Sequence, residues 1–481
     1  MNFILINPDE MRAESLGSYG HPLVKTPNLD KLAKDGVRFD QCHVTNTVCT
    51  PSRCSMLTGW YPHVRGHRSL WHMLRPEEPN LFKYLSKAGY DIIWYGKNDA
   101  FAPETFDGIV DKRLDDVVTE EEWAKINEVK KDSWVSYSKE DPLYYSFLAE
   151  EMGSFEETED YLCIEKAIDF LESSPEKPFC LYLPTELPHP VYHAPEGYHD
   201  MYDPDDIPPL RPVCENGKAD FHHKIRESRN LDKLEDRDFK EINAKYLGMI
   251  SYVDALYGRL LDTLEKTGLS DNTTIIFYSD HGDWAGDYGL VEKWPTGLDD
   301  TLTRVPLIIK TPDGAKGHLV KECVEHHDIM PTILDLAGIE ADHTFFARSL
   351  ISQIHGETGD PDRAVFAEGG YNLPQDYWCF EGRDDEDLLN KESIYYPKLQ
   401  VQQENPHTVC RSTMIRTLNY KLIYRTDDLN ELYDLEKDPL ELNNVYDDKE
   451  YQDICKDLEK RILEWYIKTS DAPEWHNHPR W

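Results

Sequence analysis

The sequence predicts an α/β fold with a mostly parallel central sheet sandwiched by helices, followed by a smaller C-terminal α+β subdomain. Short apolar runs typical of buried strands alternate with helical patterns over most of the 481 residues. The alternation stops near residue 355, where the linker-like stretch GETGDP begins. Beyond it, strand-like segments follow one another closely, as in an antiparallel sheet. We therefore expect a main domain over residues 1–355 and a subdomain over residues 356–481.

The elements of the main domain can be assigned in order. Residues 3–6 form an apolar run that ends at an Asn-Pro break, which predicts the first strand. A helix follows, with Thr26 as the expected N-cap, Pro27 at the first helical position and Gly36 as the expected C-terminal cap. Three further units are predicted, with helices at 81–88, 161–171 and 246–267 and strands at 90–95, 179–183 and 273–278.

The C-terminal subdomain has its own pattern. Residues 414–417 and 420–424 flank Leu-Asn and predict two antiparallel strands, and residues 431–435 predict a third. A helix from 448 to about 467 is expected to close the chain.

The composition excludes several classes of protein. Hydrophobic residues make up 40% of the chain, enough for a sizeable core, which excludes a disordered or collagen-like protein. Asp and Glu number 91 against 52 Lys and Arg, which gives a formal net charge of −39. A surface of that charge repels nucleic acids and anionic membranes. We therefore expect neither as a partner.

Membrane, secretion and disulfide signals are not found in the sequence. No segment offers the roughly 18 uninterrupted apolar residues that a membrane span needs. The start, MNFILINPDE, lacks the basic residues and the long apolar run of a secretion signal, so we expect a cytoplasmic protein. The ten cysteines are scattered without a CxxC pair, which predicts neither a disulfide framework nor a structural zinc site.

Polar residues follow three of the predicted strands, where the functional sites of α/β sheets lie. Asp9 and Glu10 come after the first strand, Asp280 and His281 after the strand at 273–278, and Lys97 after the strand at 90–95. Hard cations bind several carboxylate oxygens at once. Acidic groups at two strand ends can therefore share one divalent cation.

The segment CTPSRCSMLTG, residues 49–59, carries the main functional signal. It resembles the signature C-x-P-S-R-x-x-x-L-T-G of the type I sulfatases, members of the alkaline phosphatase superfamily. The resemblance implies that Cys49 is oxidised to formylglycine by a dedicated formylglycine-generating enzyme. The hydrated aldehyde is a geminal diol: one hydroxyl attacks sulfur and displaces the alcohol, and loss of the proton of the other re-forms the carbonyl as sulfate departs. Pro51 fits a helix start, whose free N–H groups would face the anion.

The resemblance spans essentially the whole chain. Residues 9–20, DEMRAESLGSYG, are similar to the family opening D-D-x-R-x-D-x-L-G-x-Y-G, and SDHG at 279–282 matches the second metal motif. Further family-like segments are found at 26–30, 304–309, 328–334 and 431–439. The family is therefore expected to determine both the fold and the chemistry.

The resemblance also implies roles for individual residues. Asp9, Glu10, Asp280 and His281 match the ligands of one divalent cation, usually calcium, which polarises a sulfate oxygen. Arg53 matches the arginine that holds the diol and the cation shell.

Three further residues match groups that contact the substrate. Lys97 and Lys293 match lysines that contact sulfate and neutralise charge in the transition state. His189 matches the histidine near the leaving oxygen, where a proton donor assists departure.

The sequence departs from the family pattern at three positions. Glu10 stands where a second Asp is usual, and its longer side chain allows it to bind the cation differently or not at all. His281 offers nitrogen where many relatives offer an Asn oxygen, so manganese or zinc becomes an alternative to calcium. Asp99 replaces a histidine that usually binds the diol, so that role passes to another group, such as His63 or His67, or lapses.

The leading interpretation is a hydrolase of O-sulfate esters on a small carbohydrate, such as a mono- or disaccharide derived from glycosaminoglycans, because a charge of −39 repels a long sulfated polymer. An alternative within the superfamily is a phosphonate monoester or phosphodiester hydrolase, and an alternative of another class is a binding protein on an inactive sulfatase fold. Five tryptophans near the motifs are candidates for stacking on a sugar ring: Trp60, Trp71, Trp94, Trp284 and Trp294. The sequence predicts no oligomeric state.

Overall fold

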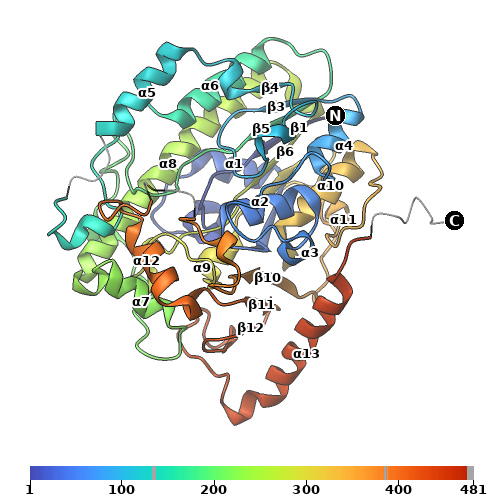
Figure 1. The fold of residues 1–481 in the computed structure, drawn as a ribbon. Coiled ribbons are helices and arrows are strands. Elements are labelled where there is room, and N and C mark those ends of the chain that lie inside the picture. Colours follow the sequence, from blue (N-terminus) through green and yellow to red (C-terminus); the bar gives the residue numbers. More distant parts are fainter. Residues whose placement is uncertain (133–136, 384–385, 387, 474–481) are drawn as a thin grey trace.

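A mixed, mostly parallel sheet forms the centre of the protein, as predicted. The computed structural model describes residues 1–132, 137–383, 386 and 388–473 (Figure 1). The strand order is β4-β3-β5-β1-β6-β8-β2-β7, and β9 also pairs with β2. Strands β4, β3, β5, β1 and β6 are parallel, whereas β8 runs antiparallel to β6 and β2. The strands are β1 (Asn2–Ile6), β2 (Val37–His43), β3 (Asp91–Trp94), β4 (Lys112–Arg113), β5 (Phe179–Leu183), β6 (Thr273–Tyr278), β7 (Arg304–Val305), β8 (Leu307–Lys310) and β9 (His318–Glu325).

The three central strands position the functional edge of the sheet. Strand β1 lies between β5 and β6 and is parallel to both, with Phe3 opposite Cys180 and Thr274. Every residue of the three strands is buried, because helices cover both faces of the sheet. The carboxyl ends of β1 and β6 therefore lie side by side, and the segments that follow them meet at one edge.

Helices cover the sheet on both sides (Figure 1). The first core cluster joins one face to α1 (Pro27–Asp35), α6 (Glu159–Glu172) and α8 (Asp236–Lys266). The second joins the opposite face to α2 (Cys49–Thr58), α4 (Leu81–Lys87) and α10 (Ile329–Ala337). The remaining helices are α3 (Pro62–Arg65), α5 (Glu120–Asp132), α7 (Phe221–Ser228), α9 (Asp300–Thr303), α11 (Ile351–Ile354), α12 (Tyr396–Glu404) and α13 (Gln452–Thr469).

Helix α1 is capped differently from the prediction. Thr26 stands at the N-cap position, but its hydroxyl bonds Asp30 and the Gly17 amide and caps no helical N–H. The carboxylate of Asp254 accepts the first helical N–H groups instead, from Asn28 and Leu29. Gly36 follows the helix in an extended conformation, not the left-handed one of a typical glycine cap. A Cβ at Gly36 would lie 2.6 Å from the Ile309 carbonyl oxygen, so close strand packing explains this glycine.

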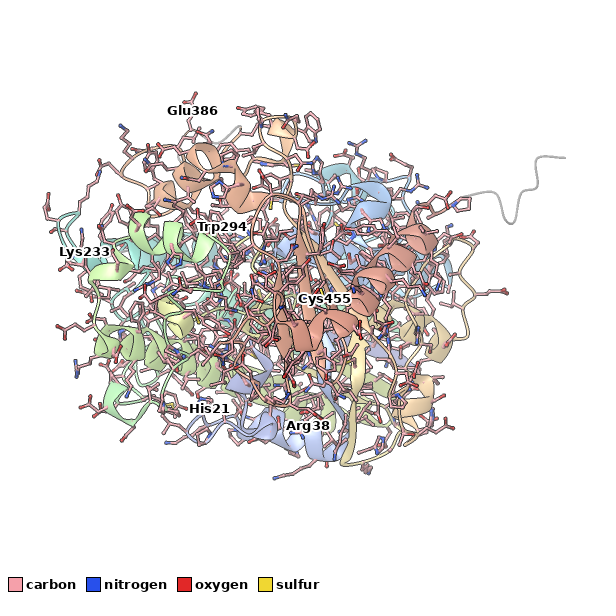
Figure 2. All side chains as sticks on the ribbon, turned by 90° about the horizontal axis from the view of Figure 1, so that it is seen from below. His21, Arg38, Lys233, Trp294, Glu386 and Cys455 are labelled. Carbon is pink, nitrogen blue, oxygen red and sulfur yellow. The ribbon has the colours of Figure 1, made fainter. Side chains whose placement is uncertain are left out.

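The C-terminal part contains a four-stranded antiparallel sheet. Its strands are β10 (Val365–Gly369), β11 (Ser412–Arg416), β12 (Tyr420–Arg425) and β13 (Glu431–Asp434), of which β10 was not predicted. Apolar residues of α13 pack on one face, and Leu298 of the main domain packs on the other. Figure 2 shows α13, with Cys455, lying across these strands, and places Trp294 inside the molecule and Lys233 and Glu386 at its edge. The boundary at residues 355 and 356 stays a prediction.

The cysteines and helices agree with two expectations from composition. All ten cysteines are free thiols, and only Cys214 among them is not buried. In the described part of the chain, none of the helices combines the length and the apolar character needed to cross a membrane.

Candidate active site

Four predicted site residues meet at the edge formed by β1 and β6. Asp9 follows β1, Asp280 and His281 follow β6, and Cys49 is the first residue of α2. The Cys49 Sγ lies 3.2 Å from His281 Nε2 and 3.6 Å from Asp9 Oδ1. One donor atom from each of the four residues lies within 4.8 Å of the others, and all four residues are buried. Two carboxylates, an imidazole and a thiol therefore surround one point at the start of a helix.

Arg53 joins the two carboxylates of this group. It lies one turn after Cys49 on α2, so both side chains project from the same face of the helix. Its Nε donates to Asp280 Oδ2 at 2.8 Å and its Nη2 to Asp9 Oδ2 at 3.1 Å. Burial would lower the pKa of Arg53, but the two carboxylates raise it well above its usual value. The guanidinium therefore stays charged and fixes the position of both acids.

Helix α2 is held to the β6 loop by further polar contacts. The Ser52 hydroxyl donates to the Asp280 carbonyl, and His326 Nε2 lies 2.8 Å from the Ser52 carbonyl oxygen. Cys49 itself is only 3% exposed, and burial, followed by the charge of Asp9, raises the pKa of its thiol well above the usual value. Unmodified Cys49 is therefore a neutral thiol, a poor nucleophile at neutral pH.

Lys97 approaches Asp9 from the end of β3. Its Nζ lies 2.7 Å from Asp9 Oδ2 and 3.1 Å from Asp99 Oδ2. Burial would raise the pKa of Asp9, but Lys97 and then Arg53 hold it well below its usual value. Asp9 is therefore ionised, and Lys97 places an ammonium group beside the cluster.

Glu10 is not among the gathered donor atoms. Its backbone is in the left-handed region, with φ of 66°, and its side chain forms an ion pair with Lys293. Burial raises the pKa of Glu10 well above its usual value although Lys293 acts in the opposite direction. Among the described residues, Glu10 Oε2 has no hydrogen-bond partner. The structure thus brings three of the four predicted ligands together and places Glu10 beside Lys293.

His189 lies next to this ion pair. Its Nε2 is 3.1 Å from Lys293 Nζ and 3.3 Å from Glu10 Oε1, and its Nδ1 is 2.6 Å from the Pro190 carbonyl oxygen. Nδ1 therefore carries the proton, and Nε2 accepts a hydrogen bond from Lys293. Burial and then the charge of Lys293 lower the pKa of His189 well below its usual value. His189 is neutral in the free protein.

A buried network behind Lys293 was not predicted. The Tyr192 hydroxyl and the Glu292 N–H both donate to Asp283 Oδ1, at 2.7 and 3.1 Å. The Glu292 carboxylate in turn bonds Arg229 and Lys398, each at 2.9 Å. Asp283 directly follows the SDHG motif and Glu292 directly precedes Lys293, so their place in the sequence was the available signal.

Two other histidines proposed as replacements for the missing family histidine are engaged elsewhere. His63 bonds Glu368 at 2.6 Å and Thr469 at 2.9 Å, and His67 lies 3.2 Å from Glu78. Four of the five candidate stacking tryptophans are buried, and Trp71 is 37% exposed.

A second group of possible metal ligands is already paired with an arginine side chain. Glu325, His327 and Asp328 place one donor atom each within 4.8 Å of the others. The guanidinium of Arg363 lies 3.0 Å from Glu325 and 2.7 Å from Asp328. The positive charge that these carboxylates need is therefore supplied by the protein.

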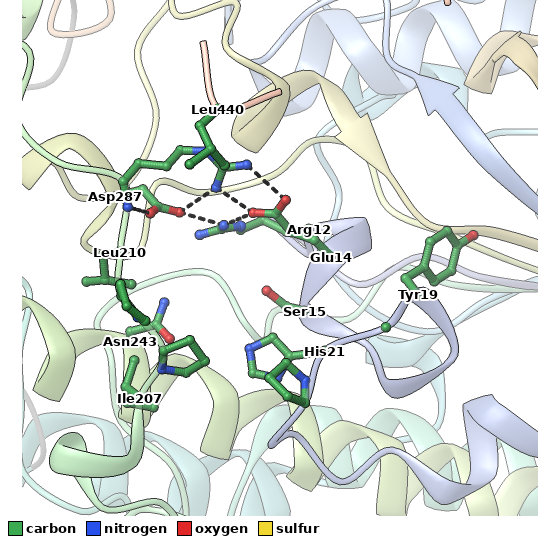
Figure 3. A pocket seen from close by; sticks show the side chains of 15 residues that line it. Arg12, Glu14, Ser15, Tyr19, His21, Ile207, Leu210, Asn243, Asp287 and Leu440 are labelled. Carbon is green, nitrogen blue, oxygen red and sulfur yellow. Dashed lines mark hydrogen bonds and ion pairs between the residues drawn. The ribbon is translucent and has the colours of Figure 1, made fainter. Parts of the chain in front are cut away.

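A surface pocket lies near Arg12, three residues after Asp9 on the chain (Figure 3). Arg12 and Arg211 bond Asp287 at 2.6 and 2.9 Å, and both also bond Glu14. His21 and Asn243 line the pocket below this network (Figure 3). No predicted site residue lines the pocket, so it is separate from the cluster around Cys49.

Comparison with known families agrees with this geometry. The model of the sulfatase family matches residues 1–339, which include all the clustered residues. The chain belongs to the sulfatase family. Residues 380–468 match the model described as N-sulphoglucosamine sulphohydrolase, C-terminal.

Relatives of this sulfatase family member cover almost its whole length. It is 27% identical to the multifunctional alkaline phosphatase superfamily protein PehA of Trinickia caryophylli, covering 99% of this chain and 97% of that protein. It is 26% identical to an N-acetylglucosamine-6-O-sulfatase of Bacteroides thetaiotaomicron, covering 98% and 87%. A phosphonate monoester hydrolase of Agrobacterium radiobacter has the same fold, with a TM-score of 0.78, 23% identity and coverage of 97% and 96%. These comparisons place the protein among the sulfuric ester hydrolases of the alkaline phosphatase superfamily.

Proposed function

We propose that the protein hydrolyses the O-sulfate ester of a small carbohydrate and that Cys49, as formylglycine, carries the nucleophile. The main support is the position of Cys49 at the start of α2, with His281 Nε2 at 3.2 Å and Asp9 Oδ1 at 3.6 Å. Arg53, Lys97 and Lys293 surround this point with positive charge. Such a set suits an anionic group whose negative charge grows in the transition state.

We also propose that Asp9, Asp280 and His281 hold one divalent cation, calcium or manganese. The donor set fits, because buried carboxylates and an imidazole lie within 4.8 Å of one another beside Cys49. Glu10 is left out of this set, because its carboxylate pairs with Lys293. When present, the cation would polarise a sulfate oxygen, and the hydrated formylglycine would supply the attacking hydroxyl.

The protein's own side chains have distinct roles in this proposal. Arg53 keeps Asp9 and Asp280 in place, while Lys97 and Lys293 bind the sulfate oxygens. His189 stands beside Lys293 and serves the leaving oxygen. The negative charge of a bound sulfate would raise the pKa of His189 and so favour the protonated ring that this role requires.

The substrate class follows from charge and from similarity. A net charge of −39 disfavours a long sulfated polymer, which leaves mono- and disaccharides. Similarity to an N-acetylglucosamine-6-O-sulfatase supports a sulfated sugar. The alternative that the sequence left open, a phosphonate monoester or phosphodiester hydrolase, would use the same nucleophile.

The test compares substrates that differ in the leaving group, nitrophenol or a sugar, and in the transferred group, sulfate or phosphonate. Turnover of 4-nitrophenyl sulfate, 4-nitrophenyl phenylphosphonate and a panel of sulfated monosaccharides is measured on protein whose Cys49 peptide has been checked for formylglycine by mass spectrometry. We expect sulfate esters to give the higher kcat/KM, and the panel to identify the sugar. A higher kcat/KM for the phosphonate would favour the alternative, and no turnover by fully modified protein would exclude both.

A further inference from the structure

Arg68 is an arginine without a counter-ion in a strongly acidic chain. Acidic residues outnumber basic ones by 91 to 52, so most arginines have a carboxylate within reach. Among the residues that the structure describes, however, Arg68 forms no ion pair and no hydrogen bond, and its Nε is buried without a partner. A partly buried guanidinium in this state is costly unless something binds it. Arg68 therefore has unused capacity to bind an anion.

The surroundings of Arg68 increase this excess of positive charge. The strongest electrostatic influence on it from another residue is that of Arg411, and the nearby carboxylate is Glu368. Glu368 is already engaged, because His63 lies 2.6 Å and Arg411 3.4 Å from its oxygens. Burial, then the repulsion by Arg411, lowers the pKa of Arg68, whereas Glu368 acts in the opposite direction.

The basic patch formed by Arg68 and Arg411 adjoins Glu368, which contacts the loop that leads into Cys49. The Glu368 N–H donates to the Thr45 carbonyl at 2.9 Å, and Asn46 donates to the Glu368 carbonyl at 2.7 Å. Thr45 and Asn46 stand four and three residues before Cys49. Glu368, which pairs with Arg411, is therefore joined by direct hydrogen bonds to the segment that precedes Cys49.

The loop that carries Arg68 is also joined to the loop of Lys97. The Leu74 N–H donates to the Ala100 carbonyl at 2.8 Å, and the Ala102 N–H donates to the Leu74 carbonyl at 2.9 Å. Lys97 lies three residues before Ala100 and contacts Asp9. The loop that follows Arg68 is therefore held to the loop that carries Lys97.

An exposed aromatic ring lies in the same loop. Trp71 is 37% exposed, and its Nε1 is fixed by a hydrogen bond of 2.9 Å to the Phe380 carbonyl. The Arg383 guanidinium lies over the ring, 5.2 Å from its centre. The part of the ring that stays exposed is apolar and lies three residues after Arg68 in the chain, which suits contact with a sugar.

We propose that Arg68, supported by Arg411, binds a second anionic group of the substrate, a carboxylate or a sulfate that is not cleaved, while Trp71 packs against the sugar that carries it. The proposal rests on the proposed function and makes it more specific: the preferred substrate is a sugar with at least two negative charges. A carboxylate and a sulfate each offer two oxygens that can accept hydrogen bonds from one guanidinium. The two sources are separated by the choice of sugars in the test.

The test measures binding of matched sugars by calorimetry. One pair is glucosamine 2-N,6-O-disulfate and N-acetylglucosamine 6-sulfate, and the other is 2-O-sulfated glucuronic acid and 2-O-sulfated glucose. The full-length protein carries Cys49→Ala, so that no sugar is hydrolysed. Arg68→Gln and Arg68→Lys are compared with Arg237→Gln, an exposed arginine that pairs with Asp205. Arg68 has no hydrogen bond to lose, so its variants are expected to fold.

We expect the sugar with two charges to bind more tightly in at least one pair. Arg68→Gln should weaken the binding of that sugar by roughly 10- to 100-fold, which is the effect of one charge-assisted hydrogen bond. The affinity for the singly charged sugar of the same pair should not change. Arg68→Lys should retain part of the difference in affinity between the two sugars of the pair. Arg237→Gln should retain all of it. The pair that shows the effect identifies a second sulfate or a carboxylate as the group bound.

Two results would overturn the proposal. One is that both sugars of each pair bind the wild-type site with equal affinity, and the other is that Arg68→Gln lowers the affinity for both sugars equally. Turnover of 4-nitrophenyl sulfate, which has no second anion, should be the same in wild-type protein and in Arg68→Gln. A wild-type protein that hydrolyses no sulfate ester would refute the proposed function instead, and the binding contrast would still decide the role of Arg68.

Discussion

Asp160 offers a test of the structure that does not depend on knowing the substrate. It lies in the first turn of α6, is buried, and accepts the N–H groups of Glu186 at 2.7 Å and Leu187 at 2.9 Å. These residues begin the loop that carries His189. Burial raises the pKa of Asp160 to about 7, although the two N–H groups favour the ionised form. Replacing it by Asn should remove a large contribution to the pH dependence of stability.

The sign and size of the effect follow from linkage. In the unfolded chain Asp160 titrates near ~3.9, so at pH values above this the folded protein binds a proton that the unfolded chain has lost. The free energy of unfolding should therefore fall as pH rises from about 4 towards the folded pKa of about 7. Each pKa unit corresponds to about 1.4 kcal/mol, so the whole fall is on the order of 4 kcal/mol and about 3 kcal/mol of it lies above pH 5.

The assay is urea denaturation at pH 5 and pH 8. Other titrating groups are shared by wild-type protein and Asp160→Asn, so the difference between them isolates Asp160. We expect the wild type to lose about 3 kcal/mol more than the variant over this interval. The control is Asp262→Asn, an exposed position on α8, which should behave as the wild type does. Equal pH dependence in wild type and Asp160→Asn would show that burial does not shift this carboxyl as described.

Four further predictions concern the cluster around Cys49. Cys49→Ala should abolish turnover of every ester; multiple turnovers by this variant would exclude Cys49 as the source of the nucleophile. Asp280→Ala should lose both activity and bound metal in elemental analysis, and active protein without metal would contradict the proposed cation. His189→Ala should slow sugar sulfates ~10²–10⁴-fold but affect 4-nitrophenyl sulfate little, because its phenolate leaves without a proton. Equal slowing of both substrates by His189→Ala would refute the acid role of His189. Lys97→Ala, by contrast, is expected to slow the hydrolysis of both substrates.

The sequence predicts the strands that are continuous apolar runs. It does not predict a strand that forms only through pairing with distant segments. Strands β5 and β6 have the predicted bounds, because each is a continuous apolar run between breaks. Strand β2 was not predicted: its sequence VRFDQCH mixes charged and apolar residues, and pairing with β8 and β9 forms it. Helix α8 begins ten residues earlier than predicted, since its first turns are polar and are stabilised by a capping box between Glu235 and Asp238.

The candidate site shows a similar division. The motif around Cys49 and the residues after β1 and β6 were sufficient to place Asp9, Asp280 and His281 together. The direction of Glu10 could not be predicted, because it depends on a left-handed backbone conformation that the sequence does not reveal. The contact between Lys398 and Glu292 joins residues 106 positions apart, and only the folded chain brings them together.

The burial of Cys49 has a consequence for how the chain is made. Residues 45 and 46, just before Cys49, are bonded to Glu368 in β10, so the contacts of this segment are complete only after residue 368 has been synthesised. Because Cys49 is 3% exposed in the folded protein, an enzyme that oxidises it needs access before folding is complete. Residue 368 is synthesised about 320 residues later, which at bacterial or eukaryotic rates takes roughly 15 to 60 s. If Cys49 is the modified residue as proposed, a host whose oxidising enzyme is slower than this interval would deliver a well-folded protein that keeps a thiol in place of the aldehyde.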